Sequence, residues 1–301
     1  MSEAHARPMV SVVVPTLNRQ KNLKRAILSF LNQDYGNYEI VIVDQSTSEL
    51  SSDLRAIIER DKKIRYFHID RAGSPIARNL GVKQSKGEII ISCDDDIVAP
   101  LSWITAHANN YHEPVVGAVA GRVLSENERG TDKIREVGKI NWLTGNLTNN
   151  FNASFRTGVD HAYGCNMSFR KGVFAKTRGF DAVFIALGHF EETDLSLRIR
   201  RLGYKIIFDP QAVVRHLQPN SGGNRVQSID ELIFWKFHNY VLLFWKNLDR
   251  RYLVIFLVYR FLDIFRWARF YNQTILVFVG LKGILSGFIS LIRMSMEGKR
   301  W

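Results

Sequence analysis

The chain has 301 residues, of which 46% are hydrophobic, so it can bury a sizeable core and is not an intrinsically disordered protein. Its 41 Lys and Arg against 29 Asp and Glu leave a formal charge of +12, which favours an anionic partner such as a phosphorylated small molecule, a nucleic acid or a membrane surface. The two cysteines, Cys93 and Cys165, are too few for a disulfide framework and lack metal-site spacing, which favours a reducing compartment.

Strands and helices are expected to alternate from the N-terminus. The first ten residues, MSEAHARPMV, lack the apolar core of a signal peptide, so a cytoplasmic location is expected. The apolar runs VSVVVP, YEIVIVD, KIRYFHI and GEIIISCD are expected strands, and NLKRAILSFLNQ and DLRAIIER carry helical spacing between them. This alternation predicts an α/β fold with a mostly parallel sheet flanked by helices.

Carboxylates gather where two of these expected strands end. Asp44 closes the second strand, and Asp94, Asp95 and Asp96 follow the fourth. Ligands of such sheets bind at the carboxyl ends of the strands, so these aspartates are site candidates. Three adjacent carboxylates repel one another unless a cation is present.

A helix is expected after the stretch IDRAGS. Ser74 is an expected cap and Pro75 suits the first turn. The free amides at the start of this helix, with Arg78 one turn further on, suit a phosphate group. An ordinary surface helix with a solvated arginine is the alternative.

Residues 97 to about 160 give weak signals, and the polar stretch from Ser125 to Gly158 is expected to be a long loop or irregular insertion. The segment TDLSLRIRRLG then predicts a helix that ends at Gly203. Three carboxylates, Glu191, Glu192 and Asp194, crowd its start, where they could also simply complement the helix dipole.

The tail from residue 229 onward is aromatic, apolar and basic. Helical spacing places Arg260, Asp263, Arg266 and Arg269 on one half of a helix, and Leu257, Phe261, Ile264, Phe265 and Ala268 on the other. We expect amphipathic helices at a membrane interface. A membrane span over ILVFVGLKGILSGFISLI, with the charge of Lys282 near its middle, and burial in an oligomer or against the rest of the chain are the alternatives.

In this order, the motifs resemble those of the large inverting glycosyltransferase family 2, which has the glycosyltransferase-A fold. The resemblance covers roughly residues 9 to 220 and is carried by VSVVVPTLNRQKNLKRAILSFLNQ, IVIVDQSTS, RAGSPIARNLGVKQSKGEIIISCDDDIVAP and GHFEETDLSLRIRR. It implies a catalytic domain, which we expect over residues 1–225, and the composition of the tail predicts a membrane-associating helical region over 226–301. The implied partners are a nucleotide diphospho-sugar donor and a saccharide or lipid-linked acceptor, but no nucleic acid, with a homo-oligomer possible.

The resemblance also assigns roles to individual residues. It implies a nucleotide-binding set made of Pro15, Thr16, Asn18, Arg19, Asp44, Arg78, Asp94 and Asp95. It further implies a divalent cation, Mg²⁺ or Mn²⁺, held by Asp94, Asp96 and His216. A carboxylate at Asp44 can accept the imide hydrogen of uracil or thymine, which favours a UDP- or dTDP-sugar. Gln45 stands where the family usually has a second aspartate, and this departure leaves the base preference open.

The family's acidic Glu-Asp motif corresponds to Glu191 and Glu192 in this chain, with Glu192 in the place of the aspartate that acts as general base. Asp194 is the reserve candidate. Asn166 and Arg170 lie in a stretch that resembles the acceptor-side framework, where a substrate contact and a structural role are both open.

Three other functions compete with this interpretation. A sugar-phosphate nucleotidyltransferase would carry a glycine-rich loop after the first strand, and PTLNRQKN contains no glycine. A nucleic-acid-binding protein would place its basic residues in a recognisable module. A catalytically decayed membrane scaffold is compatible with the departures at Gln45 and Glu192.

Overall fold

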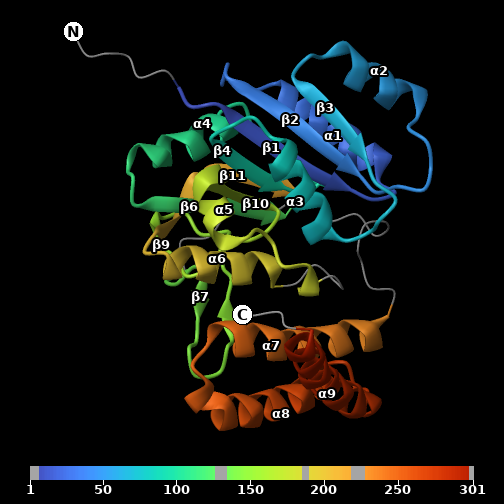
Figure 1. The fold of residues 1–301 in the computed structure, drawn as a ribbon, viewed down its shortest axis with the longest axis vertical. Coiled ribbons are helices and arrows are strands. Elements are labelled where there is room, and N and C mark those ends of the chain that lie inside the picture. The colour runs from blue at the N-terminus through green and yellow to red at the C-terminus, as the bar shows by residue number, and fades with distance from the viewer. Residues whose placement is uncertain (1–6, 126–133, 185–189, 218–227, 298–301) are drawn as a thin grey trace.

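The computed structural model of the chain describes residues 7–125, 134–184, 190–217 and 228–297. Strands and helices alternate in the first part, and three long helices follow at the C-terminal end (Figure 1). The strands are β1 (Val10–Thr16), β2 (Tyr38–Asp44), β3 (Ile64–His68), β4 (Ile89–Cys93), β5 (Ile97–Val98), β6 (Val116–Ser125), β7 (Lys139–Ile140), β8 (Leu147–Thr148), β9 (Thr157–Gly158), β10 (Asn166–Arg170) and β11 (Lys205–His216). The α-helices are α1 (Gln20–Leu31), α2 (Ser52–Arg60), α3 (Ser74–Gln84), α4 (Trp103–Ala108), α5 (Lys171–Thr177), α6 (Glu191–Arg201), α7 (Ile229–Asn247), α8 (Leu253–Phe270) and α9 (Ile275–Met296).

A central sheet organises the first part of the molecule. Its strands run in the order β3-β2-β1-β4-β10-β6-β11-β5 over the described residues, and β9 pairs with β11. The half built from β3, β2, β1 and β4 is parallel, whereas β10 is antiparallel to both of its neighbours. The predicted α/β fold is therefore confirmed, with a sheet that is parallel on one side and mixed on the other.

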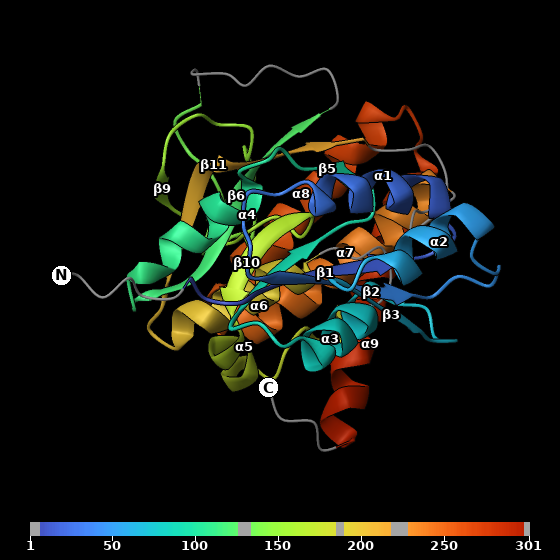
Figure 2. The same ribbon diagram turned by 90° about the horizontal axis from the view of Figure 1, so that it is seen from above.

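Helices cover both faces of this sheet, as Figure 2 shows from above. One face packs against apolar side chains of α1, α2 and α4, and the other against those of α3, α5 and α6. The strands β1 and β2 are buried on both faces, which explains why their sequences are nearly continuous apolar runs.

Strand register decides which polar residues meet. β1 and β2 pair in parallel so that Thr16 lies opposite Asp44 at their carboxyl ends. β11 pairs antiparallel with the short strand β5, and this places His216 opposite Ile97, the residue after the aspartate triplet. Residues more than a hundred positions apart in the sequence therefore meet at one end of the sheet.

The structure adds two elements that the sequence left unassigned and corrects one local expectation. Strand β6 and helix α4 lie inside the region from residue 97 to 160 that gave weak sequence signals; β6 reads VGAVAGRVLS, whose small residues lack a clear alternation. Ser74 is the first residue of α3 and does not occupy the capping position. Gly73 instead precedes the helix with a φ of 140°, a conformation that side chains with a Cβ rarely adopt.

The three C-terminal helices pack under α6 and against one another (Figure 1). Helix α9 approaches α7 closely, because a Cβ added at Gly283 would lie 2.4 Å from the carbonyl oxygen of Phe234 and one at Gly287 would lie 2.8 Å from that of His238. The Nδ1 atom of His238 also lies 3.0 Å from the hydroxyl of Ser286. One face of α9 is thus fixed to α7.

In α8, one member of the expected charged half lies in the interior, and the expected apolar half is partly exposed. Arg260 is fully buried, whereas Phe261 and Phe265 are exposed. The guanidinium of Arg260 lies 3.9 Å from the ring centroid of Tyr240, forms an ion pair with Asp263 and donates to the carbonyl oxygen of Thr144. These partners satisfy a charge that helical spacing alone would leave in solvent.

Candidate functional site

Asp44 lies at the carboxyl end of β2, almost completely buried. Its Oδ2 accepts a hydrogen bond from the Tyr66 hydroxyl at 2.8 Å, and its Oδ1 accepts one from the amide of Ser46 at 2.8 Å. The neighbouring loop after β1 is tied to the same place, because the Asn18 amide donates to the Ser46 hydroxyl. A cavity of about 810 Å³ opens beside these residues, lined by residues 45–50, Arg55, Tyr66, His68 and Asp70.

Gln45 has a structural function in this region. Its side-chain amide donates to the carbonyl oxygens of Arg71 and Gly73, directly before α3 begins. An aspartate at this position could not donate these bonds. Gln45, which departs from the family pattern, therefore stabilises the start of α3, the helix that carries Arg78.

The three consecutive aspartates between β4 and β5 have different partners. Asp94 forms an ion pair with Arg78 at 2.7 Å. Asp95 accepts a hydrogen bond from the Thr16 hydroxyl at 2.6 Å and pairs with Arg19, and burial raises the pKa of this carboxyl to about 7. Asp96 also pairs with Arg19, and it lies 2.9 Å from Nε2 of His216. Asp95 thus binds the end of β1 through Thr16, whereas Asp94 faces Arg78 and Asp96 faces His216.

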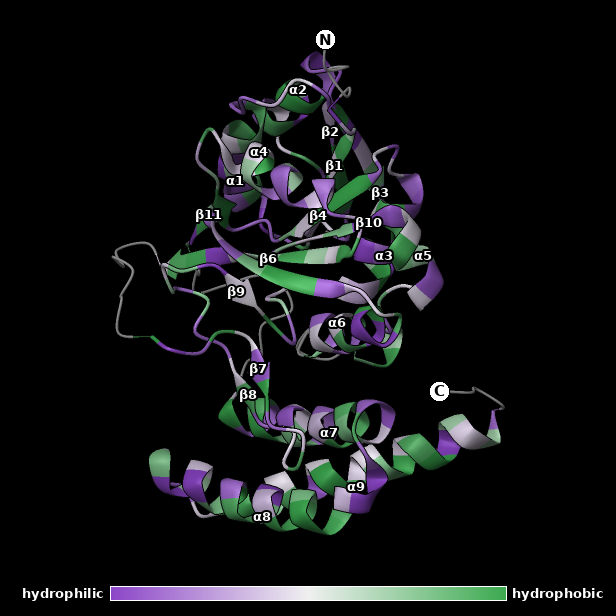
Figure 3. Ribbon diagram, turned by 90° about the vertical axis from the view of Figure 1, so that its left-hand side faces the viewer, coloured by the Kyte–Doolittle hydropathy of each residue, from purple (hydrophilic) through white to green (hydrophobic). Residues whose placement is uncertain are grey.

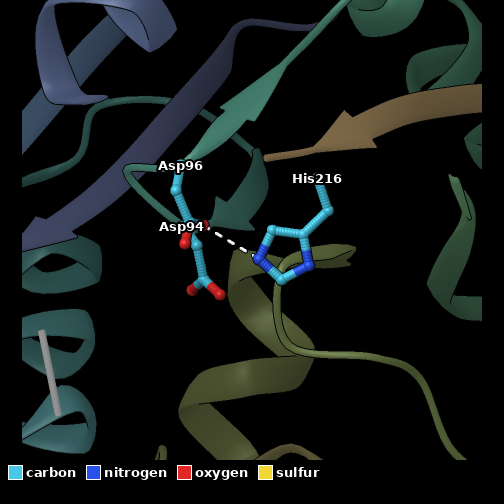
Figure 4. A group of neighbouring side chains, drawn as sticks. All are labelled: Asp94, Asp96 and His216. Atoms are coloured by element: carbon cyan, nitrogen blue, oxygen red, sulfur yellow. Dashed lines mark hydrogen bonds and ion pairs between the residues drawn. The ribbon is translucent and has the colours of Figure 1, made fainter. Parts of the chain in front are cut away.

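Asp94, Asp96 and His216 converge at the end of the sheet (Figure 4). One possible ligand atom from each lies within 4.8 Å of the others. Two carboxylate oxygens and one imidazole nitrogen form a donor set that suits Mg²⁺ or Mn²⁺, the latter especially because it also accepts nitrogen ligands. The residues fit the divalent cation that the sequence predicted.

Arg78 connects this cluster to the start of α6. Its side chain is buried, and its two terminal nitrogens bind Asp94 at 2.7 Å and Glu191 at 2.8 Å. The next residue, Glu192, is also buried, and no hydrogen-bond donor among the described residues reaches its Oε2. Burial, reinforced by the neighbouring Glu191 carboxylate and opposed by Arg78, raises the pKa of Glu192 well above its ordinary value.

Asp194, the reserve candidate for the general base, is bound by protein groups at both of its carboxylate oxygens. The side chain is fully buried, its Oδ2 accepts from Arg198 at 2.6 Å, and its Oδ1 accepts from Asn247 at 2.8 Å and lies 3.1 Å from Nζ of Lys246. Because Arg198 of the same helix occupies Oδ2 and two donors of α7 occupy Oδ1, this carboxylate is not placed to take a proton from a substrate.

Asn166 and Arg170 also bind protein groups. Asn166 is buried between Trp103, His107 and two backbone carbonyls. Arg170 donates to the carbonyl oxygens of Val116, Tyr111 and Glu113. Of the two roles left open by the sequence, the structure gives both residues the framework role.

Sequence reasoning missed a group of residues on α7 and α8. A cavity of about 320 Å³ lies next to Glu192, and its wall includes Lys236 and Tyr240 from α7 and Asp263 and Trp267 from α8. Each pair is separated by four positions and therefore shares a helix face. That spacing is a signal in the sequence, but nothing in the sequence shows that the two faces meet Glu192.

A mixed α/β sheet with carboxylates and a histidine at the carboxyl ends of its strands is the arrangement of the glycosyltransferase-A class of fold, which the solved structures of similar fold support. The chain belongs to glycosyl transferase family 2, whose sequence profile matches residues 11–178. The family and the fold expected from the sequence are thereby confirmed.

Individual relatives match parts of the chain. An uncharacterized glycosyltransferase of Rickettsia felis is 42% identical over 87 residues, which are 29% of this chain and 14% of that protein. The GalNAc(5)-diNAcBac-PP-undecaprenol beta-1,3-glucosyltransferase of Campylobacter jejuni is 30% identical over 163 residues, 50% of this chain. The chain spans 52% of that relative's length.

A solved structure extends the similarity of fold to the C-terminal helices. The mannosyltransferase PcManGT from Pyrobaculum calidifontis, in complex with GDP-Man and Mn²⁺, matches with a TM-score of 0.60 and 17% identity, and the match covers 98% of this chain and 77% of that one. At this identity the match describes the fold.

Proposed function

We propose that the protein transfers a sugar from a nucleotide diphospho-sugar to a hydroxyl of a saccharide or lipid-linked acceptor, with inversion and with the help of a divalent cation. The observation that carries this proposal is the convergence of Asp94, Asp96 and His216 on one side of Arg78, with Glu191 and Glu192 on the other. Family membership supports the same reaction class.

The donor nucleotide is proposed to bind along the carboxyl ends of β1, β2 and β4. Asp44 accepts hydrogen bonds at both oxygens yet retains lone pairs for an imide hydrogen, which favours a UDP- or dTDP-sugar. Asn18 and Arg19 border the same end of the sheet, Pro15 and Thr16 end β1, and Asp94 and Asp95 follow β4. Arg78 supplies a buried positive charge toward the diphosphate.

Asp94, Asp96 and His216 would hold the cation, Mg²⁺ or Mn²⁺. When bound, it neutralises the diphosphate and stabilises the charge that grows on this leaving group. The protein's own contribution is to keep Asp96 oriented through Arg19 and His216, and Asp94 through Arg78.

Glu192 is proposed to take the proton from the acceptor hydroxyl as that oxygen attacks the anomeric carbon. A buried carboxyl with a raised pKa and an Oε2 that no described donor reaches is suited to this task. Glu191 is instead held by Arg78, so we assign it the task of positioning that arginine. A single displacement of this kind inverts the configuration at the anomeric carbon.

The C-terminal helices are proposed to hold the enzyme on the inner face of a membrane. Figure 3 shows hydrophobic segments along α8 and α9, at the end of the molecule away from β1–β3. Among the described helices, α9 alone is long and apolar enough to cross a bilayer. Buried helices of soluble proteins can have the same length and composition. The charge of Lys282, exposed near the middle of α9, favours a helix that lies on the membrane over one that spans it.

The experiment that tests the donor and metal site is thermal unfolding of the full chain with UDP, dTDP or GDP, each with Mn²⁺ or EDTA. A nucleotide at about one hundred times its Kd adds roughly 2.7 kcal/mol of stability, which is readily seen. We expect a Mn²⁺-dependent increase in Tm with UDP or dTDP, lost in Asp96→Ala and retained in Asp53→Ala, a control on the exposed face of α2. No Mn²⁺-dependent shift with any of the nucleotides would contradict the proposal.

A further inference from the structure

We infer that α7 and α8 complete the acceptor site, and that the acceptor is a saccharide carrying a lipid tail, with Trp267 at the junction of its polar and apolar parts. This inference rests on the proposed function, because it takes Glu192 as the group that the acceptor hydroxyl must reach. It adds the residues that recognise the acceptor and the chemical class of that acceptor.

The polar part of the site is the cavity of about 320 Å³ that contains Glu192. Its other walls come from the loop around Asn146, from the segment of His161 and Tyr163, and from α7 and α8. Amide, imidazole, ammonium and carboxylate groups thus surround a space large enough for a sugar ring, and such groups bind hydroxyls.

Two charged residues of this cavity come from different C-terminal helices. Lys236 of α7 lies with its Nζ 3.9 Å from the centroid of the Trp267 ring, and burial lowers the pKa of its ammonium to about 8. Asp263 of α8 is held by the buried Arg260. A donor and an acceptor of hydrogen bonds are therefore fixed on the wall beside Glu192, and Tyr240 and Trp267, whose ring faces hold Arg260 and Lys236, add aromatic surface to the same wall.

The apolar part of the site begins at the same tryptophan. Trp267 also lines a second hollow of about 240 Å³, together with Arg266 and Phe270. The Phe270 side chain is 77% exposed, so this hollow is open to the surface of α8. Trp267 borders both hollows, so an acceptor with its sugar beside Glu192 and its apolar chain beside Phe270 would run past this side chain, and Arg266 would face a phosphate that joins the two parts.

A free polysaccharide would bind in the cavity but not in the hollow beside Phe270. The two acceptor classes therefore differ in whether an added alkyl chain strengthens binding. The probes are octyl and methyl β-glycosides of glucose, galactose and N-acetylglucosamine, kept below the concentration at which octyl glycosides form micelles. Binding to the full chain with UDP and Mn²⁺ present is followed by saturation-transfer NMR.

We expect at least one octyl glycoside to bind more tightly than its methyl counterpart, and Trp267→Ala to weaken that binding about tenfold. Phe270→Ala, at a largely exposed position where misfolding is not expected, should reduce the difference between octyl and methyl glycosides. Two controls should leave binding unchanged: Trp142→Ala, an exposed tryptophan outside both hollows, and Phe278→Ser, which removes exposed apolar surface from α9.

Equal binding of octyl and methyl glycosides, no binding of any glycoside, or wild-type binding by both Trp267→Ala and Phe270→Ala would overturn the inference. The Mn²⁺-dependent increase in Tm with UDP is recorded for every variant as a readout of the donor site. If the wild type shows no such increase, the result counts against the proposed function. If the wild type shows the increase but binds no glycoside, the result counts against the acceptor site alone.

Discussion

At the scale of single residues, the aspartate triplet shows how three like charges are kept together. Asp95 binds Thr16 and Arg19, and it therefore fixes the carboxyl end of β1 to the segment after β4. Asp94 and Asp96 remain beside His216, where a cation can join them. The repulsion among three adjacent carboxylates is thus offset by two arginines within the chain and, in the proposed enzyme, by a metal ion.

Replacing Glu192 with Gln should lower the turnover rate but raise the stability of the folded protein. Loss of a general base lowers turnover by about 10²–10⁴-fold. The same change should raise the Tm at neutral pH, because the folded protein holds the Glu192 carboxyl at a raised pKa and so disfavours its ionised form. In the wild type this cost is absent below the unfolded pKa of about 4.3 and grows as pH rises toward the folded value, so stability falls over that window.

The measurement is the Tm of wild type and Glu192→Gln at pH 4 and pH 8, together with turnover. The increase in Tm should be larger at pH 8 than at pH 4. Glu59→Gln, on α2, is the control that should change neither turnover nor the pH dependence. A turnover rate in Glu192→Gln equal to that of wild type would assign the base to another group.

The sequence predicted which residues approach the site, but it did not predict how each is used. Strand ends located Asp44 and the aspartate triplet, because a parallel sheet brings such ends together. The helical pattern could not distinguish Asp194 from Glu192, since both lie in the first turn of α6. Their difference arises from Lys246 and Asn247 of α7, which bind Asp194 and are more than fifty positions away.

At the scale of elements, the contact between α7 and α9 depends on glycines. Gly283→Ala should destabilise the protein by about 1–3 kcal/mol, because the added Cβ would lie 2.4 Å from the backbone carbonyl of Phe234, which cannot move without the helix. Gly172→Ala is the matched control, since no atom lies within 4 Å of a Cβ built there. Urea unfolding of the two variants makes the comparison, and equal midpoints would mean that α9 is not packed on α7 in solution.

Element prediction from the sequence succeeded where apolar runs are long and failed where they are not. β1 and β2 read as continuous apolar strands because both of their faces are buried. β6 was missed because its small residues carry no period, although it pairs with both β10 and β11 at the centre of the mixed half. For α8, helical spacing did not predict that Arg260 is buried, because its partners Tyr240 and Thr144 lie outside its own helix.

At the scale of the whole molecule, charge and apolar surface are arranged on the same C-terminal helices. The outward faces of α8 and α9 expose large apolar side chains, namely Val254, Val258, Phe261, Leu262, Phe265, Phe278, Leu285 and Ile292. Basic residues such as Arg266, Arg269 and Lys282 are interspersed with them. Exposed apolar surface of this extent marks an interaction site, and an anionic membrane matches both its apolar and its basic character.

Vesicle binding tests this arrangement. The full chain should co-sediment with vesicles that contain anionic phospholipid, and the double variant Phe261→Ser, Phe265→Ser should bind at least tenfold more weakly, because burial of two phenylalanine side chains contributes roughly 3–6 kcal/mol before other costs. The control is Leu28→Ser, Leu101→Ser, which removes two equally exposed apolar side chains from the transferase part of the molecule. Equal loss in both double variants would mean nonspecific adhesion. If instead both bind as wild type does, α8 does not contact the membrane, and sedimentation velocity of the same samples would show whether another copy of the chain covers the exposed face.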